Sequence, residues 1–326
     1  MVDIHNDNDD VVSRFRIQGS YDAETYGAKV GIGTDFGGYT GGVATEKIVE
    51  IYNAYAWYNF LNGVINVKGG LIDDGVWNTM GPKDWNLSNG LGVRLEVAPI
   101  EGLNFGVFLN TGANQFNAVT AEQFFKETGI GVSYTSDMFD IAAAFKLDSD
   151  EDTAAQSDLP DESKVNNVST LGGDPDVDSE VIFGFVFKGV TNLTAKAEAH
   201  GWNLGDYSDN GFLWFIEDVS YQVLEPLNVG AELTERLWGN SNIKPFFQVK
   251  PYVSYQINEP LSVGLEVPVS FQSDVLKLGI GGKPWVKYAF TEDAYIKAFY
   301  NLDYKKPDAG DATTNHAIQL DFVVKF

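Results

Sequence analysis

The sequence predicts an all-β protein, a single transmembrane antiparallel up-and-down β-barrel that occupies residues 1–326. Three observations support this fold class. Strands with one apolar face recur along the chain, short and long connections alternate between them, and aromatic residues gather near the strand ends. No run of about eighteen apolar residues occurs, so we expect no membrane-spanning helix. A barrel strand needs only about ten residues with every second one apolar.

The strands are recognised by alternation of apolar and polar residues, because successive side chains of a strand point to opposite faces. The same alternation predicts two-faced strands at 91–97, 193–202, 247–257 and 261–271. A chain end usually frays unless a neighbour holds it, so we expect the regular last strand to pair with the first strand and close a cylinder. The apolar face of this last strand carries Ile318, Leu320, Phe322, Val324 and Phe326.

The connections alternate between short and long. We expect tight turns at 60–65, 99–104, 134–139, 190–194, 224–228, 258–262 and 290–295, and longer polar connections between them, including 148–179 and 273–283. A soluble sandwich mixes its connection lengths and crosses between sheets. Tight turns at one end and long loops at the other are typical of a barrel with short periplasmic turns and long extracellular loops.

The strand count follows from the turns. Seven turns with two strands each, the last strand and the strand at 26–36 give about 16 strands, within a range of 14–18. A further good strand at 11–21 makes the count odd, whereas barrels of this kind are normally even. Either the barrel has 18 strands with a missing or irregular first strand, or one assignment is wrong. Residues 1–10 are expected to form a polar N-terminal arm.

Aromatic residues predict two belts at the levels of the lipid headgroups. The alternative is that aromatic residues simply favour strands and cover the core of a sandwich. The belt beside the tight turns would contain Trp57, Tyr58, Phe60, Tyr134, Phe139, Tyr255 and Phe290. The belt at the loop ends would contain Trp77, Trp85, Trp202, Trp238, Trp285 and Tyr304.

Composition narrows the classes of function. The chain has 22 Lys plus Arg against 46 Asp plus Glu, a formal net charge of -24, which disfavours nucleic acid as a partner. It has no cysteine, so disulfides and thiolate chemistry are excluded. The first ten residues lack the basic start and apolar core of an export signal. We therefore expect either a protein that stays inside the cell or a mature form behind an added Met1.

The final strand, with Phe322, Val324 and the terminal Phe326, resembles the C-terminal signal that the barrel-insertion machinery of outer membranes recognises. The turns at 225–227 and 259–261, both Glu-Pro-Leu, resemble periplasmic turns of bacterial porins. This resemblance to general porins implies the outer membrane of a diderm (Gram-negative-type) bacterium, contact with its lipid, and a homotrimer as one possible assembly. It implies a channel and neither an enzyme nor a cofactor.

The inward faces of the expected strands predict a water-filled pore, because their charges and glycines would be costly to bury without water. One basic wall on the early strands would contain Arg14, Arg16, Lys29, Lys68 and Arg94. Later strands would add Lys196, Glu198, His200, Glu232, Arg236, Lys250, Glu266, Lys297, Asp303 and Asp321.

The resemblance also implies a constriction. General porins narrow the pore with an inward loop whose acids face a basic wall, and the loop after Lys68 would place Asp73, Asp74 and Asp84 in that role. The transverse field would then screen solutes by charge and dipole. The alternative is that these acids only solvate an exposed loop while the basic residues pair locally with Glu50 and Glu96.

Two other classes of function remain open or disfavoured. A selective channel for a sugar or a hydrophobic ligand would use inward aromatic residues as a track, namely Tyr52, Tyr58, Phe108, Tyr252, Tyr295 and Phe299. An outer-membrane enzyme is disfavoured because His5, His200 and His316 lie in no catalytic motif. The acidic stretches 148–163 and 174–180 are interpreted as solvated loops. The alternative for 174–180 is the start of a calcium loop, because acidic residues occupy every second position there, but the required glycine and distal glutamate are missing. We expect no metal site.

Overall fold

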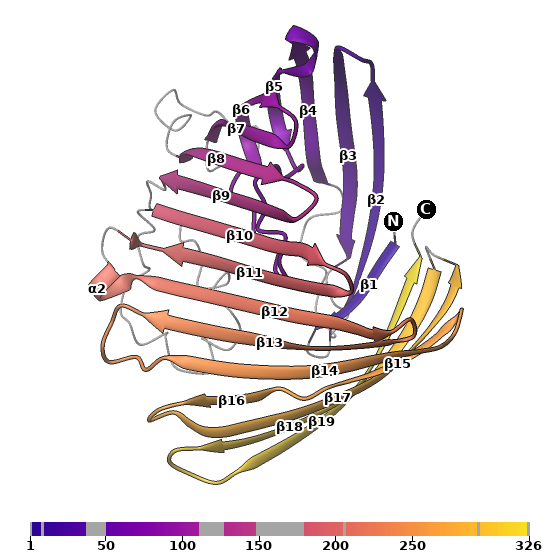
Figure 1. The fold of residues 1–326 in the computed structure, drawn as a ribbon, viewed down its shortest axis with the longest axis vertical. Coiled ribbons are helices and arrows are strands. Elements are labelled where there is room, and N and C mark those ends of the chain that lie inside the picture. The colour runs from indigo at the N-terminus through magenta and orange to yellow at the C-terminus, as the bar shows by residue number, and fades with distance from the viewer. Residues whose placement is uncertain are drawn as a thin grey trace.

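The computed structural model describes residues 2–7, 10–36, 50–110, 127–147, 179–204, 207–291 and 294–324. Strands make up most of this part of the chain (Figure 1). Its helical elements include one 3-10 turn, η1 (Leu61–Gly63), and one single-turn helix, α2 (Tyr207–Asn210). Within the described residues, no helix is long and apolar enough to cross a membrane.

The strands of the first half follow one another with few interruptions. They are β1 (Val2–Asp7), β2 (Asp10–Asp22), β3 (Tyr26–Phe36), β4 (Glu50–Phe60), β5 (Ile65–Ile72), β6 (Gly90–Ile100), β7 (Leu103–Asn110), β8 (Glu127–Thr135) and β9 (Phe139–Leu147). Those of the second half are β10 (Ser179–Val190), β11 (Leu193–Trp202), β12 (Phe212–Leu224), β13 (Leu227–Trp238), β14 (Phe246–Asn258), β15 (Leu261–Glu266), β16 (Val269–Gln272), β17 (Leu276–Thr291), β18 (Ala294–Pro307) and β19 (Thr313–Val324).

All the strands belong to one antiparallel sheet in which neighbours in the chain are neighbours in space. β15 and β16 lie end to end, and both pair with β14 and β17. They are two parts of one barrel strand, interrupted where Pro268 has no N–H to donate. Each complete strand of the barrel is called a stave. The pair Val2 and Val324 joins β1 to β19 and closes the ring. Figure 1 shows the two chain ends beside each other.

The barrel therefore has eighteen staves, because β15 and β16 count as one among nineteen strands. The expected fold class is confirmed and the count lies within the expected range, although the favoured number of 16 is two short. The additional strands are β2 and β1. β1 forms within residues 1–10, which the sequence suggested as a polar arm, and pairs with β2 from Val2 to Asp7.

The expected tight turns are confirmed, since each of the seven positions joins two paired strands. They define the turn end of the barrel, and the opposite end is the loop end. One expected long connection, 273–283, is wrong: only residues 273–275 separate β16 from β17. Gly279 and Gly281 lie on the inner face of β17, where they alternate with outward Leu278 and Ile280.

The outer face of the barrel is apolar. Exposed aliphatic side chains lie on strands all round the ring, among them Ile130, Val249, Val286 and Leu320, the last 66% exposed. A water-soluble protein would bury side chains of this kind, whereas a surface in contact with lipid requires them.

The belt at the turn end is largely as expected. Tyr58, Phe60, Tyr255 and Phe290 are exposed on the outer face. Trp57 instead lies on the inner face, where its ring covers Gly27. Because Tyr58 alternates with Trp57, Tyr58 belongs to the belt and cannot also line the lumen.

The tryptophan belt expected at the loop end is wrong. Trp77 is fully buried, and Trp85, Trp202 and Trp238 pack in or against buried clusters inside the barrel. Trp285 lies on the inner face of β17 beside Lys297. Composition cannot distinguish these cases, because a tryptophan near a strand end suits either face. The inner position of these tryptophans is determined largely by residues 73–89, a loop that enters the barrel and packs against apolar side chains there.

Candidate functional site: the lumen and its inward loop

The connection from β5 to β6, residues 73–89, enters the barrel and is named the inward loop. Ile72 and Gly90 on either side of it are direct register partners, so a tight turn would suffice to join the two strands. The loop forms neither helix nor strand. Its sequence, DDGVWNTMGPKDWNLSN, is rich in Asn, Asp and Gly, residues that favour turns over regular structure.

A buried apolar cluster holds the inward loop against the barrel wall through Trp77 and Leu87. Trp77 and Leu87 form a buried cluster with Phe108 of β7, Ala144 of β9 and Ile182 of β10. The Trp77 Nε1–H also donates to Asn104 Oδ1 at 3.1 Å, so the polar atom of this buried ring is satisfied.

Two glycines of the barrel wall make room for the loop. A Cβ at Gly131 of β8 would lie 2.0 Å from the Trp77 ring, and a Cβ at Gly184 of β10 would lie 2.0 Å from the Thr79 carbonyl oxygen. Both separations are far below van der Waals contact. Any larger residue at either position would force the loop away from the wall.

Trp85 anchors the second part of the loop on β11 and β12. Its ring lies 5.1 Å from that of His200, 5.1 Å from that of Trp214 and 6.5 Å from that of Trp202. His200 Nε2 lies 3.0 Å from Glu180 Oε2, and Lys146 Nζ lies 3.4 Å from the other oxygen of that carboxylate. The charged groups beneath the tryptophan cluster are thus paired.

Glu198 of β11 binds the loop through both carboxylate oxygens. Oε2 accepts from Thr79 Oγ1 at 2.6 Å, and Oε1 accepts from the Lys83 backbone N–H at 2.7 Å. Thr79 Oγ1 in turn accepts from the Trp85 N–H at 2.9 Å. The Glu198 side chain is buried, so these charge-assisted hydrogen bonds stand in for lost hydration.

The start of the loop lies against basic residues of β3, β5 and β6. Lys29 Nζ lies 3.0 Å from Asp73 Oδ1, and Asn53 Nδ2 donates to Asp73 Oδ2 at 2.6 Å. Lys68 pairs with Asp74 at 2.5 Å.

Arg94 is the most buried member of this group and has no exposed surface. Its guanidinium donates to Asp74 Oδ1 at 2.9 Å and to Glu96 Oε1 at 2.8 Å. Lys68 also reaches Glu96 Oε1, at 3.4 Å. Three cations, Lys29, Lys68 and Arg94, therefore meet three carboxylates, those of Asp73, Asp74 and Glu96.

Not every residue of the expected constriction meets this group. Asp84 lies at the far side of the loop, where its backbone N–H bonds to Glu198, and its side chain is exposed. Arg14 and Arg16 lie on β2, but their side chains fall outside the described residues, as does that of Glu50. Both sequence-based interpretations are thus partly represented: Asp73 and Asp74 meet the basic wall, and Glu96 also pairs with it locally.

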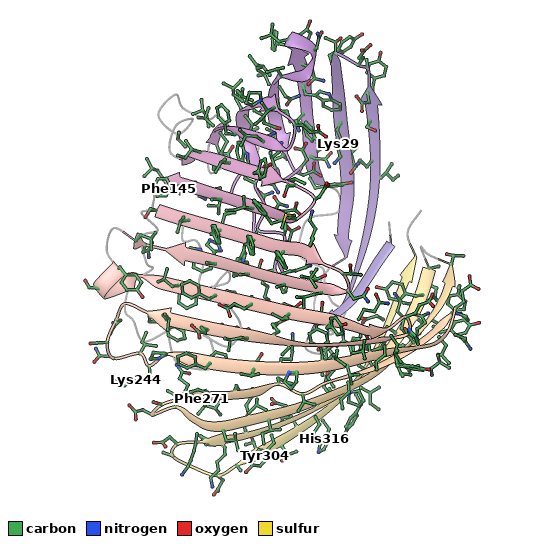
Figure 2. The ribbon with its side chains drawn as sticks, in the orientation of Figure 1. Lys29, Phe145, Lys244, Phe271, Tyr304 and His316 are labelled. Atoms are coloured by element: carbon green, nitrogen blue, oxygen red, sulfur yellow. The ribbon has the colours of Figure 1, made fainter. Side chains whose placement is uncertain are left out.

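We name the inner face of β3–β12 the covered wall, because the loop contacts described above all fall on it. The inner face of β14–β19 is the open wall. Lys250 there pairs with Glu232 of β13 at 2.8 Å, and Tyr252 donates to Asp218 Oδ2 of β12 at 2.9 Å. Figure 2 shows Lys29 on β3 near one end of the view, and near the other end Tyr304 and His316, which lie on the outer faces of β18 and β19.

The remaining lumen residues expected from sequence lie on inner faces. Lys196 shares its face of β11 with Glu198, and Arg236 of β13 lies 4.6 Å from the Trp214 ring. Glu266 faces Lys283, while Asp321 faces Lys297 and accepts from Gln319. Asp303 pairs with Lys305 at 3.1 Å.

The C-terminal residues expected to signal insertion are described only in part. Phe322 lies on the outer face and is 47% exposed. Val324 pairs with Val2 and Ala294 through the backbone, and Phe326 lies outside the described residues. The acidic stretch 148–163 and most of 174–180 also lie outside them. The described residues contain no group of three or more side chains arranged to hold a metal ion.

Sequence reasoning missed several residues of the lumen. The sequence interpretation places Trp77 and Trp85 in a belt and Lys283 in a loop at 273–283. It does not include Lys287 among the lumen residues. A signal for the second error exists: Lys283, Trp285 and Lys287 occupy every second position and alternate with Pro284 and Val286. No sequence signal identifies the loop contact of Gly184, since it depends on how the loop crosses the lumen.

The closed ring, the apolar outer face and the charged inner face together define a porin-like β-barrel. The outer-membrane channel DcaP of Acinetobacter baumannii has a similar structure, with a TM-score of 0.50 and 11% identity over 96% of this chain and 85% of that chain. Engineered variants of a porin from Rhodopseudomonas blastica align with TM-scores of 0.46 and 0.47, at 16% identity, over 96% of this chain and 90% of theirs.

The likeness to DcaP shows a shared fold. No protein-family model matches the sequence, and no curated protein matches it. The chain is therefore similar to outer-membrane channels in architecture, and its function has to be argued from its own residues.

Proposed function

We propose that the protein is an outer-membrane porin, a water-filled channel through which small hydrophilic solutes and ions diffuse passively. One observation carries the proposal: apolar side chains cover the outside of a closed ring of eighteen staves, while charged side chains line the inside. Lumen charges of this kind require water around them. A ring of this size is also wide enough to hold an aqueous channel.

The inward loop would form the constriction. It occupies the sector of the lumen beside the covered wall, and its Asp73 and Asp74 lie against Lys29, Lys68 and Arg94. Solutes would pass between the loop and the open wall. The protein would sit in the outer membrane of a diderm bacterium, inserted by the barrel-insertion machinery, with a homotrimer as a possible assembly.

The contacts of the lumen aromatic residues favour a general pore over a selective aromatic track. Phe108 is fully buried beneath the loop, and Tyr58 faces outward. Tyr295 and Phe299 have lysine ammonium groups over their rings. A ligand sliding on aromatic faces would need these faces free.

Conductance and liposome swelling test the proposal. Purified protein in a planar bilayer should produce discrete conductance steps, and proteoliposomes should swell at rates that fall smoothly with the size of the sugar. The absence of conductance steps from protein that keeps its compact, heat-modifiable form on gels would contradict the porin function. Swelling that saturates with one sugar would support the selective channel instead.

The constriction is tested by the paired change Asp73→Asn and Asp74→Asn. The three basic residues then lose two of their three carboxylate partners, so we expect ion preference to move toward anions. Reversal potential under a KCl gradient measures this preference. Asp84→Asn is the matched control, because Asp84 is exposed and away from the basic residues. An unchanged reversal potential in the double variant would remove these acids from the constriction.

A further inference from the structure

The open wall contains three lysines whose charges are held by aromatic rings. On β17 and β18, Lys283 Nζ lies 4.4 Å from the centre of the Phe299 ring, and Lys287 Nζ lies 4.1 Å from that of Tyr295. Lys297 Nζ lies 4.7 Å from the centre of the Trp285 ring. We name these three lysines and three rings the lysine ladder.

The ladder is continuous because the two strands are in register. Trp285 faces Phe299 and Lys287 faces Lys297 across the β17–β18 pair. Lys283, Trp285 and Lys287 alternate with outward residues on β17, and Tyr295, Lys297 and Phe299 do so on β18. All six side chains therefore occupy one face, that of the lumen.

Carboxylates are near the ladder but do not pair with it. Glu266 lies opposite Lys283 on β15, and Asp321 lies opposite Lys297 on β19. Among the described residues, none of the three lysines forms an ion pair within 4.0 Å. With three ammonium groups and two carboxylates, this part of the lumen keeps an excess of positive charge.

The type of partner decides what the lysines can do. A carboxylate in contact with an ammonium group cancels its charge. An aromatic face attracts the ammonium through the ring quadrupole and holds it in place, while the net charge stays positive. Two lysines directly opposite each other, such as Lys287 and Lys297, repel each other, and an anion between them would relieve that repulsion.

The ladder also leads inward from a hollow at the loop end. A cavity of about 540 Å³ lies above it and is lined by Gly279 and Gly281 of β17 and by Asp303 and Lys305 of β18. These four residues lie on the inner faces of the same two strands, between the ladder and the loop end, and Gly279 and Gly281 are the register partners of Lys305 and Asp303. A solute that leaves the cavity along β17 and β18 meets Lys283 next.

We propose that the lysine ladder is a binding path for small anions, so that this acidic protein conducts anions along its open wall. The proposal rests on the porin function and names the class of solute for one part of the pore. Net charge does not argue against it, because the densest acidic stretches, 148–163 and 174–180, lie outside the strands of the open wall.

A change that leaves every charge in place gives the sharpest test. In the variant Trp285→Leu, Tyr295→Leu and Phe299→Leu, the lysines lose their rings and become free to pair with Glu266 and Asp321. We expect the permeability of chloride relative to potassium, from reversal potentials in a KCl gradient, to fall by about two- to fivefold. The paired change Tyr288→Leu and Phe290→Leu is the control, because these exposed rings lie on the outer face of the same strand.

A second variant removes the charges themselves. Lys283→Gln, Lys287→Gln and Lys297→Gln should lower chloride permeability further and should also abolish any saturation of the current by acetate. Heat-modifiability on gels establishes that each variant is a folded barrel. If wild-type protein forms no conducting channel, the porin function fails. If it conducts and the ring variant keeps the wild-type reversal potential, the porin function stands and the lysine ladder is overturned.

Discussion

The covered wall and the open wall each contain three basic residues whose partners are of opposite kinds. On the covered wall, Lys29, Lys68 and Arg94 meet carboxylates at 2.5–3.0 Å. On the open wall, Lys283, Lys287 and Lys297 meet aromatic rings at 4.1–4.7 Å. The first arrangement is electrically balanced and holds a loop in place, whereas the second remains positively charged and faces the lumen.

The difference shows how the partner of a basic side chain determines whether its charge is neutralised or remains available in the lumen. A buried ion pair is costly to break, since the remaining charge has neither water nor a counter-ion. A lysine over a ring at a water-filled surface loses little when a solute replaces part of its hydration. Each of the following predictions compares a change on the covered wall with a matched change elsewhere.

The largest expected effect on stability comes from Arg94. Arg94→Met removes the fully buried cation between Asp74 and Glu96, and we expect the free energy of unfolding to fall by about 3–5 kcal/mol. Lys283→Met on the open wall, which breaks no ion pair, should cost less than about 1 kcal/mol. Guanidinium unfolding in detergent, followed by tryptophan fluorescence, measures both. Equal losses in the two variants would contradict the contrast between the walls.

A smaller effect is expected where the wall makes room for the loop. Gly184→Val places a side chain where the Thr79 backbone lies, so the loop has to move, at a cost of about 1–3 kcal/mol. Gly69→Val is the control, because a Cβ at Gly69 meets nothing within 4 Å. Acrylamide quenching should also increase as Trp77 loses its buried position. A Gly184→Val protein with the stability and quenching of the control would mean that the loop does not rest on β10.

The smallest effect is expected at Glu198. Glu198→Gln keeps the shape but weakens the hydrogen bonds from Thr79 and the Lys83 backbone, each by about 0.5 kcal/mol. The loop should then open more often, and trypsin should cut after Lys83 several times faster than in the wild-type protein. Glu232→Gln changes a lumen carboxylate that pairs with Lys250 and not with the loop, so its cleavage rate should match the wild type. Slow cleavage in both variants would leave Glu198 without a role in holding the loop.

Much of the fold could be predicted from the sequence because each strand carries its own signal. Alternation identified the strands, and the turn residues identified the tight connections. Strand β1 could not be predicted, because residues 2–7 include polar residues on both faces. Only its pairing with β2 and β19 identifies it as a strand. β17 was hidden in part because its inward glycines at 279 and 281 resemble a loop.

The candidate site was less accessible to prediction. Asp73 and Asp74 directly follow a strand that carries Lys68, so their meeting with basic residues could be expected. Asp84 could not be placed, since the path of a loop without regular structure depends on long-range contacts, here with Trp77, Trp85 and Glu198. The lysine ladder depends on the register between β17 and β18, which sequence alone does not fix.

The most direct test of the central claim, that the inward loop narrows a water-filled pore, is the single-channel conductance of a protein without that loop. Because Ile72 and Gly90 are register partners, residues 73–89 can be replaced by an Asn-Gly turn that suits a two-residue hairpin. We predict discrete channels with at least about twice the wild-type conductance, as expected when a constriction is removed from a wide barrel. A heat-modifiable barrel of unchanged conductance would contradict the claim.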